Sequence, residues 1–106
     1  MKNDETQYLQ SLSDRIGAVV KKRGWKKNWS SGGCYIHLEV SEFIESLRGK
    51  GETSPEKEGG DILVAFFAVL DWYNIPIADI VENTDKTIAY LESLGDAPYP
   101  GEEHGL

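Results

Sequence analysis

Residues 39–72 read EVSEFIESLRGKGETSPEKEGGDILVAFFAVLDW, and this stretch decides the fold. It begins as an acidic helical segment, passes through a connection rich in Gly, Thr and Ser, and ends in the most apolar run of the chain. It contains two acidic pairs, Glu39 with Glu42 and Glu58 with Asp61, each with a spacing of three. Residues three apart lie on one face of a helix, so each pair directs two carboxylates to one side.

The four carboxylates meet if the two helices pack antiparallel across the short connection. Such a cluster repels itself and needs cations, and hard divalent ions prefer oxygen ligands. Asp61 also leads directly into the apolar helix, where a carboxylate must be paired, protonated or bound to metal. Few basic residues are placed to pair with it. We therefore expect Mg²⁺, with Mn²⁺ as the alternative ion, bound by Glu39, Glu42, Glu58 and Asp61.

Apolar residues at helical spacing predict four helices and no strand, so the expected fold class is all-α. The helices are predicted at residues 6–23, 33–48, 55–73 and 77–94. Gly24, Pro76 and Gly95 separate or end them, and Ser54 with Pro55 is typical of a helix start. Residues 1–94 are predicted to form one domain, and residues 95–106, which lack periodicity, a flexible tail.

The apolar faces of the middle two helices predict an assembly. The second helix carries an apolar stripe, with Glu39 at its edge, formed by Ile36, Val40, Phe43, Ile44 and Leu47. The third helix has hardly a polar position between Ile62 and Leu70, which is typical of a helix buried on all sides. Four short helices can hardly bury it alone, so we expect a dimer or a larger assembly.

Composition limits the classes of function. The chain has 106 residues, 40% of them hydrophobic, and a formal net charge of −7, which argues against a nucleic-acid polymer as partner. The single cysteine, Cys34, excludes an intrachain disulfide and a cysteine metal cage and favours a reducing compartment. The polar N-terminus has no apolar signal region, and the longest apolar run is too short to cross a bilayer. We expect a cytoplasmic protein.

At motif level, LEVSEFIESLRGKG (38–51) and EGGDILVAFFAVLDWYNI (58–75) resemble the MazG family of nucleoside triphosphate pyrophosphohydrolases. This family belongs to the all-α NTP pyrophosphatase superfamily. Its pattern is ExxE, a spacer of variable length, then ExxD at the start of an apolar helix. The family often has a second acid before the first Glu, where this chain has Leu38, and this difference leaves the number of metal ions open. In outline the resemblance covers residues 6–92.

The resemblance implies a four-helix MazG-like bundle completed by dimerisation, as a homodimer or homotetramer. It implies Mg²⁺-dependent hydrolysis of a free (deoxy)nucleoside triphosphate to the monophosphate and pyrophosphate, with dCTP-type nucleotides within the family's range. One of the carboxylates, or Glu45, would accept the proton of the attacking water. Asn83 and Lys86 resemble the family's asparagine and basic residue that contact the substrate phosphates.

Two basic segments offer further substrate contacts. In the loop after the first helix, a lysine can bind phosphate and a tryptophan can stack on a base. In the connection after the second helix, basic side chains can reach the released pyrophosphate. The candidates are Trp25, Lys26, Lys27, Trp29, Arg48 and Lys50. The competing interpretations are solvated surface charge and, for the tryptophans, a cover over the end of the core.

Two other classes of function compete with the hydrolase. In a non-catalytic helical interaction or regulatory module, the apolar third helix would be the docking surface. A ferritin-like di-iron bundle needs Glu-x-x-His pairs, and this sequence has none. A nucleophilic triad is not evident either, because His37 and His104 have no matching Ser or Cys arrangement.

Overall fold

The computed structural model describes residues 4–25 and 29–98, and for residues 29–34 it describes the backbone only. Within these ranges the chain forms four helices and no strand: α1 (Asp4–Arg23), α2 (Trp29–Leu47), α3 (Pro55–Trp72) and α4 (Ile77–Ser93). The all-α prediction is confirmed. Helix α2 begins four residues earlier than predicted, because the Ser and Gly residues at 30–33, which are poor helix formers, were expected to form a loop.

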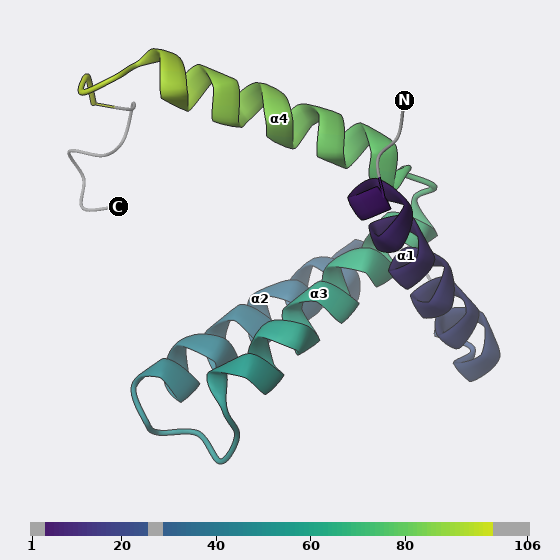
Figure 1. The fold of residues 1–106 in the computed structure, drawn as a ribbon. Coiled ribbons are helices and arrows are strands. Elements are labelled where there is room, and N and C mark those ends of the chain that lie inside the picture. Colours follow the sequence, from purple (N-terminus) through teal and green to yellow (C-terminus); the bar gives the residue numbers. More distant parts are fainter. Residues whose placement is uncertain (1–3, 26–28, 99–106) are drawn as a thin grey trace.

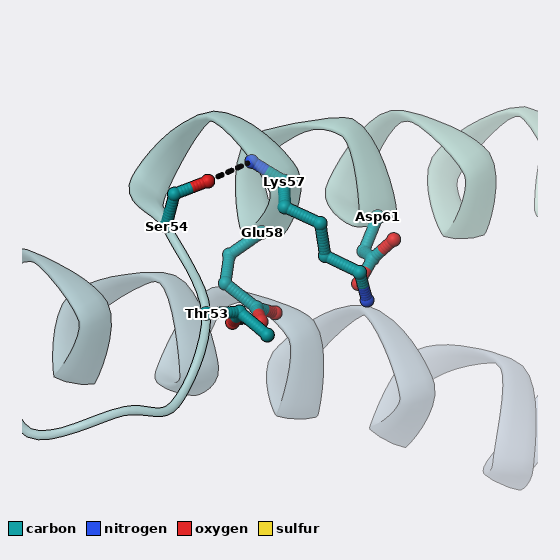
Figure 2. Close-up of polar contacts among 5 residues, drawn as sticks. All are labelled: Thr53, Ser54, Lys57, Glu58 and Asp61. Atoms are coloured by element: carbon teal, nitrogen blue, oxygen red, sulfur yellow. Dashed lines mark hydrogen bonds and ion pairs between the residues drawn. The ribbon is translucent and has the colours of Figure 1, made fainter.

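The connection between α2 and α3 is built from local signals. Gly49, two residues after the end of α2, has φ 71°, a left-handed conformation that glycine adopts without a steric penalty. Ser54 is the extended N-cap of α3, and its hydroxyl oxygen accepts a hydrogen bond from the Lys57 N–H at 3.2 Å (Figure 2). Pro55 occupies the first helical position, where its missing N–H is not needed. These signals bring α3 back along α2.

Helices α2 and α3 form an antiparallel hairpin, α1 packs against α3, and α4 packs against α1 and projects away from the hairpin (Figure 1). The small core lies where α1, α3 and α4 meet. Its buried members are Phe67, Leu70 and Ile77, and partly buried side chains such as Leu12 and Ile16 pack on them. The radius of gyration is 16.2 Å, against about 13 Å for a compact domain of this size. The single chain is therefore open.

The open shape leaves apolar side chains in solvent. In the predicted stripe of α2, Val40, Ile44 and Leu47 are exposed, and only Ile36 and Phe43 are partly buried. Among residues 35–47 of α2, the buried positions are instead Glu39 and Ser46, because α3 covers α2 on that face. On α3, Leu63 is 51% exposed, so the all-round burial expected for this helix is not reached within one chain.

The break between α3 and α4 turns the chain sharply. Asn74 has φ 56°, a left-handed conformation that asparagine tolerates, and Pro76 precedes the first turn of α4. No described helix is by itself long and apolar enough to cross a membrane. Helices α3 and α4 reach the necessary length and hydropathy only when taken together, and they are bent by 118° at this break.

Candidate metal centre

Three of the four expected carboxylates converge between α2 and α3. Glu39 of α2 and Glu58 of α3 are both only 7% exposed, and the side chain of Asp61 is 33% exposed. One carboxylate oxygen from each of the three lies within 4.8 Å of the others. Glu42 is exposed at the edge of this group. We call Glu39, Glu58 and Asp61 the carboxylate cluster.

Helical spacing explains the convergence. On α2, Glu39, Phe43 and Ser46 follow one another at spacings of four and three, so they share the face that meets α3. On α3, Glu58 and Asp61 share a face in the same way. Gly59 faces the ring of Phe43, and a Cβ atom at this position would lie 3.8 Å from the ring, an ordinary van der Waals distance.

The surroundings of Glu39 raise the pKa of its carboxyl. Burial raises the pKa of its carboxyl, and the negative charges of Glu42, Asp61 and Glu58 raise it further, with a hydrogen bond to Glu42 acting in the same direction. Its Oε2 atom is buried and has no hydrogen-bond partner among the described residues. Buried polar atoms are almost always satisfied, so this oxygen is a place where a cation would bind.

Three neighbours of the cluster were not predicted. The Thr53 hydroxyl donates a hydrogen bond to Oε2 of Glu58, and Nζ of Lys57 lies 2.6 Å from Oδ2 of Asp61 (Figure 2). Burial raises the pKa of the Tyr35 phenol, and so do the nearby charges of Glu39 and Asp61. Tyr35 and Lys57 each precede a cluster residue by four, a signal readable from the sequence. Thr53 lies in the connection and gives no such signal.

The ion pair corrects one premise of the sequence analysis. Few basic residues were expected to be placed to pair with Asp61, yet Lys57, one helical turn earlier, forms an ion pair with it. The hydrogen bond and the charge of Asp61 raise the pKa of the Lys57 ammonium, so it stays protonated. The pairing reaches one carboxylate only, because no ion pair to Glu39 or Glu58 is present in the described part of the chain.

A polar groove with a volume of about 440 Å³ lies beside the cluster. Glu42 and Glu45 of α2 form one wall, Lys57 and Glu58 of α3 the other, and residues 51–53 of the connection close one end. Glu45, which was expected to face solvent or a neighbouring subunit, is exposed on this wall. The groove therefore has one cationic side chain among several acidic ones.

The predicted contacts of the first loop lie partly outside the described residues. Trp25 is half-exposed and lines an apolar cavity of about 570 Å³ between α1 and α3, together with Ile16 and Val64. Lys26 and Lys27 are not described, and of Trp29 only the backbone is described, at the start of α2.

The remaining predicted contacts are exposed. Arg48 and Lys50 lie in the connection after α2, next to the groove-lining residue Gly51. Asn83 and Lys86 lie on α4, which points away from the hairpin (Figure 1), and the Asn83 amide donates a hydrogen bond to the backbone oxygen of Asp79 at 2.8 Å. Within one chain, these two side chains are not brought to the carboxylate cluster.

Comparisons of the chain with protein-family models, with curated proteins and with solved structures found no match. The resemblance to the MazG family therefore rests on the two acidic motifs, their spacing and the apolar helix that follows them. The chemistry of the site has to be argued from its own geometry.

That geometry fits a hard divalent ion. The donor atoms are carboxylate oxygens, which Mg²⁺ and Mn²⁺ prefer. Two oxygens bound to one Mg²⁺ at about 2.1 Å are at most about 4.2 Å apart. Only one pair among three ligands can lie in trans positions, and cis oxygens lie about 3.0 Å apart, so the spread of up to 4.8 Å has to shrink by up to about 2 Å on binding. The cluster could hold a metal ion, and Lys57 would compete with that ion for Asp61.

Proposed function

We propose that this chain is a Mg²⁺-dependent nucleoside triphosphate pyrophosphohydrolase that converts free (deoxy)nucleoside triphosphates, dCTP-type nucleotides among them, to the monophosphate and pyrophosphate. The observation that carries this proposal is the buried Oε2 of Glu39, which has no hydrogen-bond partner among the described residues and lies in a group of converging carboxylates. An arrangement of this kind is costly to fold unless a cation binds to it or a carboxyl is protonated. The ExxE and ExxD motifs and the polar groove beside them support the same function.

Each acidic residue has a role in this proposal. Glu39, Glu58 and Asp61 would hold the ion, and Glu42, at the edge of the cluster, would be the fourth ligand. Bound Mg²⁺ neutralises phosphate charge and makes water more acidic, which is what phosphoryl chemistry needs. Glu45, exposed on the groove wall, is the residue that we assign to accept a proton from the attacking water.

Three sites follow one another along α3. Lys57 and Glu58 line the polar groove, Asp61 belongs to the cluster, and Val64 lines the apolar cavity. Six residues of helix separate Glu58 from Val64, which is about 9 Å along the axis and about 120° around it, so the groove and the cavity open on different faces of α3. A base that stacks on Trp25 would have to reach round the helix from a triphosphate in the groove.

A homodimer or homotetramer is part of the proposal. The stretch of α4 from Glu82 to Ser93 has no buried or half-buried residue, yet it carries the apolar side chains Ile88 and Leu91. Ile44 and Leu47 of α2 are exposed as well. A second copy would cover these faces and would give Asn83 and Lys86 a route to a neighbouring site. A cytoplasmic setting, where free nucleotides are abundant, is the one that we propose.

The direct test is a nucleotide panel. The protein is incubated with each NTP and dNTP in the presence of Mg²⁺, and the products are separated. We expect a monophosphate and pyrophosphate from at least one nucleotide. Release of inorganic phosphate alone, or no turnover with any nucleotide, would overturn the proposal.

Asp61→Asn tests the assignment of the ligands. This change removes a ligand charge and is expected to abolish turnover, while far-ultraviolet circular dichroism stays unchanged. Asp14→Asn, on the exposed face of α1, is the matched control and is expected to keep full activity. Activity that survives in the Asp61 variant would show that the ligands are assigned wrongly.

The exposed apolar faces of α2 and α4 favour one alternative, a non-catalytic interaction module that uses these faces to bind another protein. Thermal stability separates the two functions. A hydrolase of the proposed kind is stabilised by Mg²⁺ and by nucleotide, because ligands that bind only the folded state raise its stability. No shift with either ligand would favour the interaction module.

A further inference from the structure

Lys57 breaks a local rule of helix formation. It is the third residue of α3 after the N-cap Ser54, the position at which a capping box has Glu or Gln. A positive charge in the first turn is also unfavourable, because the N-terminal end of the helix dipole is positive. The helix start therefore does not explain this lysine. Residues that break a local rule often belong to functional sites.

The contacts of Lys57 suggest what it does. Its Nζ lies 2.6 Å from Oδ2 of Asp61, in the only ion pair within residues 4–25 and 29–98 (Figure 2). The same side chain lines the polar groove, so one flexible stem can reach both places. The pair is held loosely, because the Lys57 side chain is 59% exposed and exposed ion pairs are weak. The ammonium can therefore leave Asp61 at little cost.

We propose that Lys57 is a tethered counter-ion of Asp61, that a divalent cation displaces it, and that the freed ammonium then binds the phosphates of the ligand in the groove. The identity of that ligand as a polyphosphate rests on the proposed function. The exchange of one cation for another at Asp61 rests only on the cluster.

Charge accounting shows why this arrangement couples two binding events. With Lys57 in place, the three carboxylates of the cluster and the ammonium carry a net charge of −2. A divalent ion that takes over the lysine's place brings the cluster to −1, and the ammonium becomes a free +1 in the groove. A cation that binds alone has to displace Lys57 from Asp61, and the displaced ammonium is left without a negative partner. When a polyphosphate binds together with the cation, its phosphates pair with the displaced ammonium. Cation and anion therefore bind cooperatively, and the coupling is reciprocal.

The test uses Lys57→Met, which keeps the length of the side chain and removes its charge. Isothermal titration with Mn²⁺ alone is expected to give a dissociation constant about two- to fivefold lower for the variant than for the wild type. This factor corresponds to the interaction energy of a weak, exposed ion pair. Titration with a preformed complex of Mn²⁺ and inorganic tripolyphosphate is expected to show the opposite, weaker binding to the variant. Lys57→Arg keeps the charge and should restore both wild-type affinities. Lys22→Met, in the last turn of α1, is the matched control.

Unchanged or weaker Mn²⁺ binding by Lys57→Met overturns the proposal, and so does equal binding of the preformed complex to the variant and the wild type. The outcome is separable from that of the proposed function, because neither titration requires turnover. If the wild type hydrolyses no nucleotide but Lys57→Met changes both affinities, the counter-ion proposal stands and the proposed hydrolase function falls. If the wild type hydrolyses nucleotides but Lys57→Met changes neither affinity, the hydrolase function stands and the counter-ion proposal falls. Circular dichroism and thermal unfolding of each variant verify that it is folded.

Discussion

Replacing Glu39 with glutamine is expected to stabilise the protein in the absence of divalent ions. The side chain is only 7% exposed, and its buried Oε2 has no hydrogen-bond partner in the part of the chain that the structure describes. An unsatisfied buried acceptor costs about 1–3 kcal/mol, and a charged one costs more. Glutamine removes the charge and adds an amide N–H₂ that can donate to the neighbouring Glu42. We therefore expect the free energy of unfolding to rise by about 1–3 kcal/mol, which for a domain of this size is at least about 4 °C in Tm.

The effect depends on pH in a defined direction. Burial and the neighbouring carboxylates raise the pKa of Glu39 in the folded state above its unfolded value. Between these two values the folded carboxyl holds a proton that the unfolded one has lost, so the stability of the wild type falls as the pH rises through this window. The advantage of the variant is therefore largest above the folded pKa and disappears below the unfolded one.

Magnesium should act against the variant. An ion at 100 times its dissociation constant stabilises the wild type by about 2.7 kcal/mol, and Glu39→Gln loses a ligand charge and most of this gain. Urea unfolding at neutral pH, with EDTA and then with excess Mg²⁺, measures both effects, and Glu82→Gln on the exposed face of α4 is the control. Lower stability of the variant in EDTA, or a response to Mg²⁺ equal to that of the wild type, would refute the reasoning.

Three further changes test the fold and its assembly. Ser54→Ala removes the N-cap of α3 and should cost about 1 kcal/mol, seen as a lower urea midpoint; an unchanged midpoint would contradict the role of the cap. Phe67→Ala empties a core position that is 5% exposed and should cost about 3–5 kcal/mol, so a small shift in Tm would mean that the core lies elsewhere. Leu91→Lys changes an exposed residue of α4 and should lower the mass measured by light scattering without lowering helix content, and an unchanged mass would count against α4 as an interface.

The helices could be predicted because each one has a complete local signal. Periodic apolar positions locate α1 and α4, and Pro55 and Pro76 mark the beginnings of α3 and α4 within one residue. The burial of Glu39 does not follow from this periodicity, because Val40 and Ile44 of the apolar stripe beside it are themselves exposed. Local rules thus determine which segments form helices.

Tertiary arrangement could not be predicted to the same extent. Periodicity locates the apolar stripe of α2 but not its neighbours: a single helix covers only one side of it, so Ile44 and Leu47 stay exposed within one chain. The Lys57–Asp61 pair is readable from its spacing of four, which places the ammonium one helical turn before the carboxylate. The contact of Thr53 with Glu58 depends on the path of the connection, which no periodic pattern encodes.

The projecting half of α4 has a consequence for local motion. Because every residue from 82 to 93 is exposed in the described part of the chain, this half gains little from tertiary packing, and short helices without such packing are marginal in water. In dilute solution its amide hydrogens should exchange almost as fast as those of a fraying end, whereas the amides near Phe67 and Leu70 open only when the whole protein unfolds. If α4 forms the proposed contact between two copies of the chain, amide exchange in residues 82–93 slows as the protein concentration rises.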